Sequence, residues 1–268
     1  MKAEKLFDVS GQVAFVTGAA SGLGLAMAQV LAENGARVAM VDIDGARLEP
    51  LVRKMREAGC EVEAVVLDVA DVEALRRSID AAAKKHGRLD AVFANAGISS
   101  GPGIATETGR VSGRIENTSL DTWERVLKIN LTSAFVTMQS AAVHMKAQRS
   151  GRIVVTASIA GLRADGFVGY PYSATKAALV NLVRQAAREL APYNVLVNAI
   201  APGPFLTNLA GGRLRNDPAA HEEFRRIVPL GRIAEPREIK GLALFLASQA
   251  SSYLTGTVIP IDGGISAG

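Results

Sequence analysis

The sequence predicts an α/β domain built on a doubly wound parallel sheet, with helices on both faces. Seven short runs rich in β-branched and other apolar residues recur along the chain, and helical patterns separate them. The runs lie at 12–17, 36–42, 61–67, 89–96, 152–157, 194–200 and 257–262. Strands that are apolar nearly throughout are buried on both faces, which is typical of parallel sheets covered by helices. We therefore expect one domain spanning 1–268, with a seven-stranded parallel sheet.

The composition fits one globular domain and narrows the classes of function. Of 268 residues, 49% are hydrophobic and 21% are charged, enough for a sizeable core. The net charge is +4, but the basic residues are interspersed with acidic ones and only 5% of residues are aromatic. We therefore expect no nucleic-acid partner. The single cysteine, Cys60, excludes an intramolecular disulfide and favours a reducing, cytoplasmic setting. No stretch approaches the ~18 apolar residues of a membrane span. No signal peptide is visible and the histidines lack ligand spacing, so we expect neither a membrane anchor nor a metal.

The loop after the first predicted strand is rich in glycine. Gly18, Gly22 and Gly24 follow the run at 12–17 with the spacing G-x-x-x-G-x-G, in place of the usual G-x-G-x-x-G. If a helix begins near Ser21 or Gly22, its free N–H groups face whatever lies above the strand. A connecting turn is the alternative, but glycine weakens the first turn of a helix and three glycines are more than a turn needs. The loop therefore favours phosphate binding.

An acidic residue, Asp42, ends the second predicted strand. It lies eighteen residues after Gly24, about where dinucleotide-binding folds place an acid for the adenosine ribose. Its alternative role is to cap the next helix, for which Asp44 is equally available. A carboxylate here would repel a 2′-phosphate by ~4 kcal/mol at ~4 Å and an effective dielectric of ~20. No basic residue stands at position 43 or in place of Ser21, so the sequence favours NAD over NADP.

Polar or glycine residues also follow the later strands. They are Asp68 after the third, Asn95 and Gly97 after the fourth, Ser158 after the fifth, and Pro202 with Gly203 after the sixth. Ligands of doubly wound sheets bind beyond the carboxyl ends of the strands. Ordinary strand exits look similar, so this pattern supports a site at that edge without identifying it.

Two predicted helices carry polar residues on faces that should pack inward. Tyr172 and Lys176 lie four residues apart and share a face with an apolar stripe in the helix at 169–190. A buried lysine is costly unless it is used, and the alternative is a lysine whose ammonium reaches water. Asn130 lies in the apolar stripe of the helix at 119–145, so its carboxamide needs partners. It is either a structural tether or a group that orders a water or a neighbouring lysine.

Together these motifs resemble the short-chain dehydrogenase/reductase family, in its single-domain type of about 250 residues. The resemblance covers nearly the whole chain and rests on Thr17-Gly18-x-x-x-Gly22-x-Gly24, Asn95-Ala96-Gly97, Asn130, Ser158, Tyr172-x-x-x-Lys176 and the stretch 202–207. It implies a Rossmann-type fold, a homotetramer, and hydride transfer between a nicotinamide cofactor and a secondary alcohol or ketone. The alternative is a catalytically idle NAD-binding scaffold or redox sensor, against which the intact Ser158, Tyr172 and Lys176 argue.

The resemblance implies a role for each matched residue. Tyr172 would be the general acid/base, and Lys176, with the positive nicotinamide ring, would favour its phenolate. Ser158 would orient the substrate oxygen, and Asn130 would hold a water that feeds a proton relay. The cofactor would be held by Gly18, Ser21, Gly22, Leu23, Gly24, Asp42, Asp68, Val69, Asn95, Ala96, Gly97, Tyr172, Lys176, Pro202, Gly203 and Thr207. Alternatively, Asp68 only ends a strand, Thr207 caps a helix, and Asn95 serves the sheet.

Two segments depart from the family pattern. Ser158 and Tyr172 are fourteen residues apart, one more than expected. The segment 99–118 is about ten residues longer than usual and has no core pattern, so we expect a surface loop near the active-site mouth, either shaping specificity or neutral. The segment 204–230 is expected to form the substrate lid. Its Arg213 and Arg215 would either grip a carboxylate or phosphate of the substrate or be solvated.

Overall fold

The protein is a three-layer stack of helices, sheet and helices. The computed structural model describes residues 2–267, and its seven-stranded sheet has the order β3-β2-β1-β4-β5-β6-β7. Every neighbouring pair of strands is parallel. The strands are β1 (Val13–Thr17), β2 (Arg37–Asp42), β3 (Val62–Val66), β4 (Ala91–Ala94), β5 (Gly151–Thr156), β6 (Val195–Pro202) and β7 (Val258–Ile261). The predicted seven-stranded parallel sheet is confirmed.

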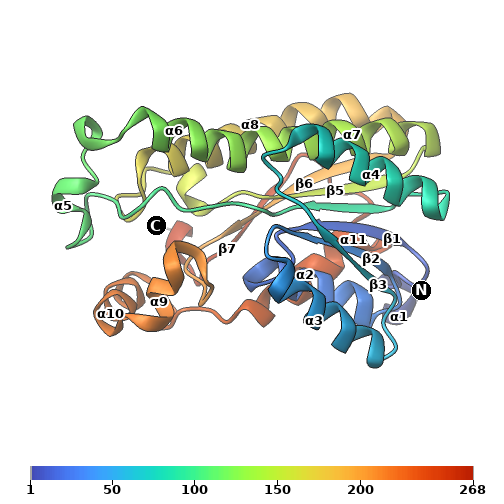
Figure 1. The fold of residues 1–268 in the computed structure, drawn as a ribbon, viewed down its shortest axis with the longest axis horizontal. Coiled ribbons are helices and arrows are strands. Elements are labelled where there is room, and N and C mark those ends of the chain that lie inside the picture. The colour runs from blue at the N-terminus through green and yellow to red at the C-terminus, as the bar shows by residue number, and fades with distance from the viewer. Residues whose placement is uncertain (1, 268) are drawn as a thin grey trace.

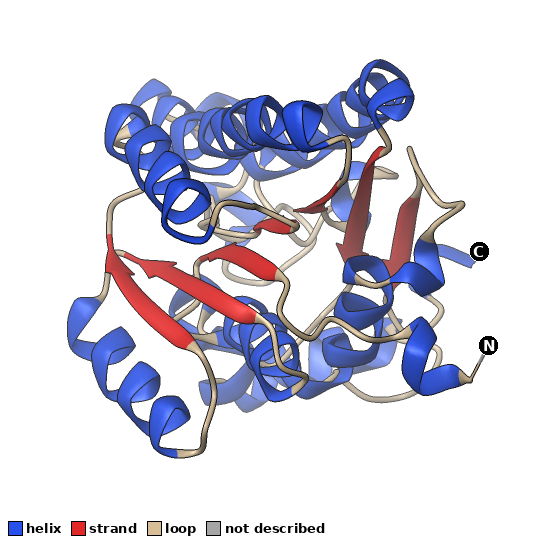
Figure 2. Cartoon of the chain, turned by 90° about the vertical axis from the view of Figure 1, so that its right-hand side faces the viewer, coloured by secondary structure: helices blue, strands red, loops and turns tan. Residues whose placement is uncertain are grey.

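Helices cover both faces of the sheet (Figures 1 and 2). One layer holds α2 (Gly22–Glu33), α3 (Gly45–Glu57) and α11 (Lys240–Ala247), and the other holds α4 (Val72–His86), α7 (Ser133–Gln148) and α8 (Tyr170–Leu190). The remaining α-helices are α1 (Ala3–Leu6), α5 (Gly109–Ser112), α6 (Leu120–Val126), α9 (Arg213–Asn216) and α10 (Pro218–Ile227). Successive side chains of a strand point to opposite faces. Accordingly Phe15 of β1 packs in the core beneath α4, α7 and α8, and its neighbour Val16 packs in the core beneath α2, α3 and α11.

The strand order places a topological switch between β1 and β4. From β1 the chain proceeds outward through β2 to β3, then returns to pair β4 with the other side of β1. The loops that leave the carboxyl ends of β1 and β4 therefore diverge, and doubly wound sheets bind ligands in the crevice between such loops. Gly18 and Asn95 are the first residues of these loops that the sequence assigns to a cofactor site.

The predicted helix around Asn130 is interrupted by a π-helical turn, Leu127–Thr132, between α6 and α7. The predicted buried stripe is confirmed in α7, from Ala134 to Met145. In α6 the buried residue is Val126, whereas Leu127 is only partly buried. The wider π turn changes the helical phase, so a single stripe of period 3.6 cannot describe both halves.

The two segments that depart from the family pattern pack against each other. The Gly103 N–H donates to the carbonyl of Phe167 at 3.1 Å, and the Ala105 N–H donates to that of Gly166 at 2.8 Å. The segment 99–118 also contains α5, so it is not the irregular loop that its composition predicts. A Cβ on Gly103 would lie 2.2 Å from the Gly166 oxygen, so only glycine lets the two backbones pack this closely. Its surface position is as predicted, because Ile115 is exposed.

The lid at 204–230 consists of a 3₁₀ turn, Leu209–Gly212, followed by α9 and α10. It meets the loop before α8 through an edge-to-face pair of Phe167 and Phe224, with ring centroids 4.9 Å apart. A small buried cluster of Ile159, Val228 and Ile265 fixes its far end. The lid, the 158–172 loop and the 99–118 segment thus form one connected roof.

Candidate active site

The glycine loop joins β1 to α2 at the carboxyl edge of the sheet. Gly18 (φ +68°) and Gly22 (φ +54°) adopt left-handed conformations that favour glycine. A Cβ on Gly24 would lie 2.1 Å from the Gly18 oxygen, so no side chain fits there. Ser21 precedes α2 but its hydroxyl makes no capping hydrogen bond, which leaves the N–H groups of the first turn able to donate to a phosphate. The helix begins where the sequence predicts, and the loop fits the phosphates of a dinucleotide.

Asp42 links this loop to the turn after β2. Its carboxylate accepts from the N–H of Ala20 at 2.9 Å and from the N–H of Asp44 at 3.0 Å. Asp44, not Asp42, caps α3 by accepting from the Arg47 N–H at 3.0 Å. Of the two roles left open, capping therefore belongs to Asp44. Each Asp42 oxygen receives one bond and keeps a lone pair that a ribose hydroxyl could use.

Other predicted cofactor residues hold the sheet edge together. The Asn95 amide donates to the Thr17 carbonyl, and its oxygen accepts from the Thr156 hydroxyl, both at 3.0 Å. The carboxamide thus ties β1 to β5, which is the sheet role that the sequence left open. Val69 is buried in the core, whereas Asp68 is exposed and accepts from the Ala70 N–H at 2.9 Å. Ala96 and Gly97 follow Asn95 along the same loop, and the Ala96 N–H donates to the Thr17 hydroxyl at 3.0 Å.

Tyr172 and Lys176 lie on the first two turns of α8, with Pro171 in the first turn. Lys176 is only 3% exposed, so the alternative of a solvated ammonium is wrong. Its Nζ donates to the Thr156 carbonyl at 2.6 Å and lies 5.5 Å from the centroid of the Tyr172 ring. Two further N–H donors of the ammonium remain for a ligand.

Ser158 follows β5 and brings its hydroxyl to Tyr172. It is buried, accepts from the Ala160 N–H at 3.2 Å, and lies close enough to the Tyr172 phenol to lower its pKa. The structure therefore brings together the three side chains that the sequence predicts as catalytic.

Burial shifts the pKa values of both Tyr172 and Lys176. Burial raises the pKa of Tyr172, and the hydrogen bond from Ser158 opposes it. Burial also lowers the pKa of Lys176 to about 8, so this ammonium is itself disfavoured. That Lys176 and the positive nicotinamide ring together favour the phenolate stays a prediction, because the charge of the ring comes with the bound cofactor.

Asn130 lies in the π turn and is buried. Its Oδ1 accepts from the N–H of Ile98 at 2.8 Å, and its Nδ2 donates to the carbonyl of Ile98 at 2.9 Å. Gly97 permits this approach, since a Cβ there would lie 3.3 Å from Oδ1. Of the roles left open, the carboxamide serves as a tether between the helix and the segment after β4. That Asn130 also holds a water that feeds a proton relay stays a prediction, since its side chain keeps one N–H and its oxygen a second acceptor position.

The lid begins directly above the glycine loop. Pro202 ends β6, and a Cβ on Gly203 would lie 2.7 Å from the Asp262 Cβ, so the chain leaves the sheet through a tight passage. Thr207 then reaches Gly22, whose added Cβ would lie 3.2 Å from the Thr207 methyl. The Thr207 hydroxyl accepts from the Leu209 N–H at 3.3 Å. Thr207 therefore shapes the local turn and lies against the glycine loop.

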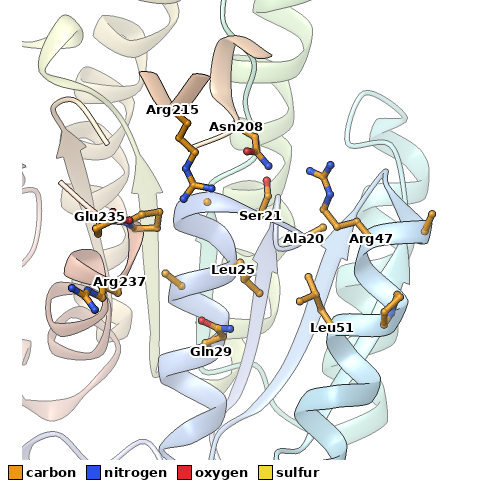
Figure 3. Close-up of a pocket in the computed structure, with 15 residues that line it drawn as sticks. Ala20, Ser21, Leu25, Gln29, Arg47, Leu51, Asn208, Arg215, Glu235 and Arg237 are labelled. Carbon is orange, nitrogen blue, oxygen red and sulfur yellow. The ribbon is translucent and has the colours of Figure 1, made fainter. Parts of the chain in front are cut away.

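A cavity of about 760 Å³ opens beside the glycine loop (Figure 3). Its lining includes Ser21 of the loop, Arg47 of α3, Arg215 of the lid and Arg237. Neither Arg47 nor Arg237 is predicted from the sequence. Arg47 stands five residues after Asp42, and only the turn of α3 brings it to the loop, so a basic residue one turn into that helix is the signal to seek.

Among residues 2–267, no helix combines the length and apolar character that crossing a bilayer requires. Within the same range, His, Cys, Asp and Glu side chains nowhere gather in threes as a metal site requires.

Comparisons with known proteins decide the family. A family model described as enoyl-(acyl carrier protein) reductase matches residues 18–266. Cyclohexanol dehydrogenase of Rhodococcus sp. (strain TK6) is 37% identical over 276 residues, covering 95% of this chain and 96% of that protein. A short-chain type dehydrogenase/reductase of Mycobacterium marinum, known from its crystal structure, is 33% identical with a TM-score of 0.89, covering 98% of this chain and 99% of the other. The chain belongs to the short-chain dehydrogenase/reductase family. The oxidoreductase class is thereby confirmed.

The relatives differ in the substrates that their names carry, and NADP is the cofactor seen in one of their structures. A gluconate 5-dehydrogenase of Burkholderia cenocepacia J2315, solved in complex with NADP and tartrate, is 30% identical, with a TM-score of 0.89 and 100% of both chains covered. That structure and the cyclohexanol dehydrogenase carry different substrates in their names. Family membership therefore establishes a nicotinamide-dependent oxidoreductase, and the finer assignment depends on this chain's own residues.

Proposed function

We propose that the protein is an NAD-dependent dehydrogenase/reductase that interconverts a secondary alcohol and its ketone, with Tyr172 as general acid/base. The observation that carries the proposal is the contact of Ser158, Tyr172 and Lys176 at the sheet edge that also holds the glycine loop. When bound, the nicotinamide ring supplies or accepts the hydride and, in its oxidised form, adds a positive charge near the phenol.

The side chains divide the proton chemistry among them. In oxidation the Tyr172 oxygen takes the proton of the substrate hydroxyl, and in reduction it returns a proton to the carbonyl oxygen. Ser158, beside Tyr172, holds the same substrate oxygen in line. Lys176 anchors the ring face from below and offers its remaining N–H groups to a ribose. Asn130, which Ile98 holds in place, is proposed to hold a water that feeds the proton relay.

The preference for NAD is proposed from Asp42. Two backbone N–H groups fix its carboxylate beside the glycine loop, where it can accept from the hydroxyls of an adenosine ribose. A 2′-phosphate at that place would meet a like charge, and like charges ~4 Å apart repel by ~4 kcal/mol at an effective dielectric of ~20. Arg47, the nearest basic residue after Asp42 in the chain, pairs with Asp44 at 3.6 Å.

The substrate is proposed to be a compact secondary alcohol, cyclic or sugar-like. The roof formed by the lid, the 158–172 loop and the 99–118 segment encloses the region above Tyr172, and the edge-to-face Phe167 and Phe224 hold it together. Relatives that are named for cyclohexanol and gluconate support this class. A cytoplasmic location remains a prediction.

A homotetramer is proposed through the helical layer of α7 and α8. Phe135 and Val143 of α7 are 44% and 66% exposed, so this helix presents apolar side chains to the outside. Light scattering coupled to size exclusion tests the assembly, and a monomer would contradict it.

Calorimetric titration of the purified protein with NADH and with NADPH tests the proposed function. NADH should bind at least about tenfold more tightly, followed by oxidation of secondary alcohols with NAD⁺. Equal or tighter binding of NADPH would refute the role of Asp42, and binding of neither would refute the dehydrogenase. NADH binding without turnover across an alcohol and ketone panel would favour the idle scaffold or redox sensor.

A further inference from the structure

Arg215 differs from the other arginines of the lid. Within residues 2–267, the other three have carboxylates within reach of an ion pair: Arg213 lies 3.7 Å from Asp217 and 3.6 Å from Glu223, Arg225 lies 2.6 Å from Glu222, and Arg226 lies 3.0 Å from Glu222. Arg215 has no such carboxylate in the part of the chain that the structure describes. It is exposed instead toward the cavity beside the glycine loop.

Figure 3 shows how Arg215 reaches this cavity. Its side chain descends from α9 toward the space above Ser21, with Asn208 of the lid beside it. Arg47 points into the same space from α3, and Arg237 stands on a third wall. Glu235 is the one acidic residue among the lining residues, and Arg47 pairs with Asp44 at 3.6 Å, so Arg215 is the guanidinium aimed at the loop. The chemistry of this rim fits an anion.

The backbone of the lid holds Arg215 in this position. Ala210 (φ +54°), Gly211 (φ +69°) and Gly212 (φ +75°) are three consecutive left-handed residues immediately before α9. The sharp turn brings α9 back over the start of the lid, where Thr207 already contacts Gly22. A left-handed alanine costs about 1 kcal/mol, so this turn is maintained against a local preference.

The position of Arg215 is unfavourable without an anion. The N-terminal end of α2 carries a partial positive charge, and its first N–H groups are not capped by Ser21. A guanidinium aimed at that end from above adds a second positive group. A phosphate between them would accept from the backbone N–H groups on one side and from the planar guanidinium fork on the other.

We propose that Arg215 binds a phosphate group of the dinucleotide, so that the lid closes on the cofactor. The inference rests on the proposed function, because it takes its ligand from there. The phosphate is either the bridging pyrophosphate or the 2′-phosphate of NADP, and the two differ in which cofactor depends on Arg215. Cofactor binding then orders α9 and α10 before the substrate enters, and the roof above Tyr172 closes as a consequence.

The test compares affinities for NADH and NADPH by calorimetry in wild type, Arg215→Ala, Arg215→Lys and Arg226→Ala. Arg226→Ala is the matched control, since this substitution removes the same charge from the exposed side of the lid. Arg215→Ala should weaken binding about tenfold or more, because a charge-assisted hydrogen bond is lost. The affinity of Arg215→Lys should lie between those of wild type and Arg215→Ala, since lysine keeps the charge but lacks the planar guanidinium fork. Thermal unfolding of each variant verifies that the fold is intact.

The pattern across the two cofactors identifies the phosphate. Equal losses for NADH and NADPH place Arg215 at the pyrophosphate, and a loss confined to NADPH places it at the 2′-phosphate. Unchanged affinities, or losses no larger than those of Arg226→Ala, overturn the proposal while wild-type NADH binding and turnover leave the proposed function standing. Trypsin cleavage after Arg225 and Arg226 gives a second readout. NADH should slow it in wild type and not in Arg215→Ala, and equal protection in both would contradict lid closure through Arg215.

Discussion

The ammonium of Lys176 lies against the ring face of Tyr172, 5.5 Å from its centroid, rather than at its hydroxyl. Its one described hydrogen bond goes to the Thr156 carbonyl at 2.6 Å. Lys176 therefore fixes the ring more directly than it stabilises a phenolate. This geometry agrees with burial, not charge, being the largest influence on the pKa of Tyr172.

Tyr172→Phe tests the general acid/base. The ring and its packing on Lys176 remain, whereas the group that exchanges the proton is lost. We expect kcat to fall by about 10²–10⁴-fold with NADH affinity unchanged within about twofold. Tyr170→Phe is the control, because Tyr170 is 40% exposed and lies outside the group. Turnover that survives in Tyr172→Phe would transfer the role to another residue.

Lys176 should make the stability of the protein depend on pH. Its pKa is about 8 in the folded protein and 10.5 ordinarily, so between these values the unfolded chain holds a proton that the folded protein has lost. Stability should therefore rise with pH across this window, by roughly 1 kcal/mol per pH unit. Lys176→Met has no titrating ammonium at this position. The unfolding free energy of wild type should therefore rise relative to that of the variant from pH 8 upward. A constant difference in denaturant titrations would show that Lys176 does not titrate there.

The sequence predicts the fold well because its information is local. A run such as 12–17 is apolar on both faces, and only a buried parallel strand accommodates it between two helical layers. The glycine spacing and the four-residue step from Tyr172 to Lys176 likewise depend only on nearby positions. These features are read correctly without knowing which strands pair.

The partners of buried carboxamides depend on contacts distant in sequence. Asn130 finds Ile98 thirty-two positions away, and Asn95 bridges Thr17 and Thr156, so neither set of contacts follows from helical or strand period. The same holds for the cavity, where elements from three parts of the chain bring Arg47, Arg215 and Arg237 together. Desolvation of Tyr172, which raises the pKa of its phenol, is likewise a property of the whole fold.

Asp42→Ser tests the basis of cofactor choice. Serine keeps a short acceptor for the neighbouring N–H groups but removes the negative charge from the ribose site. We expect NADH to bind about tenfold more weakly and NADPH at least about tenfold more tightly than in wild type. Asp44→Ser removes the same charge two residues away and preserves the cap of α3, so its affinities should stay near those of wild type. If both variants change the two affinities equally, Asp42 acts through its charge in general and not through contact with the ribose.

Gly24→Ala tests the close packing of the glycine loop. Its new Cβ would lie 2.1 Å from the Gly18 oxygen, and a backbone atom cannot yield as a side chain can. We expect a loss of about 1–3 kcal/mol in unfolding free energy and weaker NADH binding. Gly241→Ala is the matched change, since nothing lies within 4 Å of its Cβ in α11. It should stabilise the protein by about 0.5–1 kcal/mol, measured by the same denaturant titration. If Gly24→Ala changes neither the unfolding free energy nor NADH binding, the loop has room for a methyl group that this close packing excludes.

Phe167 and Phe224 should act as a unit, because their edge-to-face contact joins the loop before α8 to the lid. Leucine at either position keeps apolar bulk and removes the aromatic geometry. Each single variant should raise KM for the substrate with a smaller effect on kcat, since the roof loosens while Ser158, Tyr172 and Lys176 stay in place. The double variant should lose less than the sum of the two, with a coupling of about 0.5–1.5 kcal/mol. Phe7→Leu is the control, because Phe7 pairs with Phe245 at 6.4 Å, outside the roof. Additive losses would show that the lid is held by its buried end at Val228 and that the aromatic contact contributes nothing of its own.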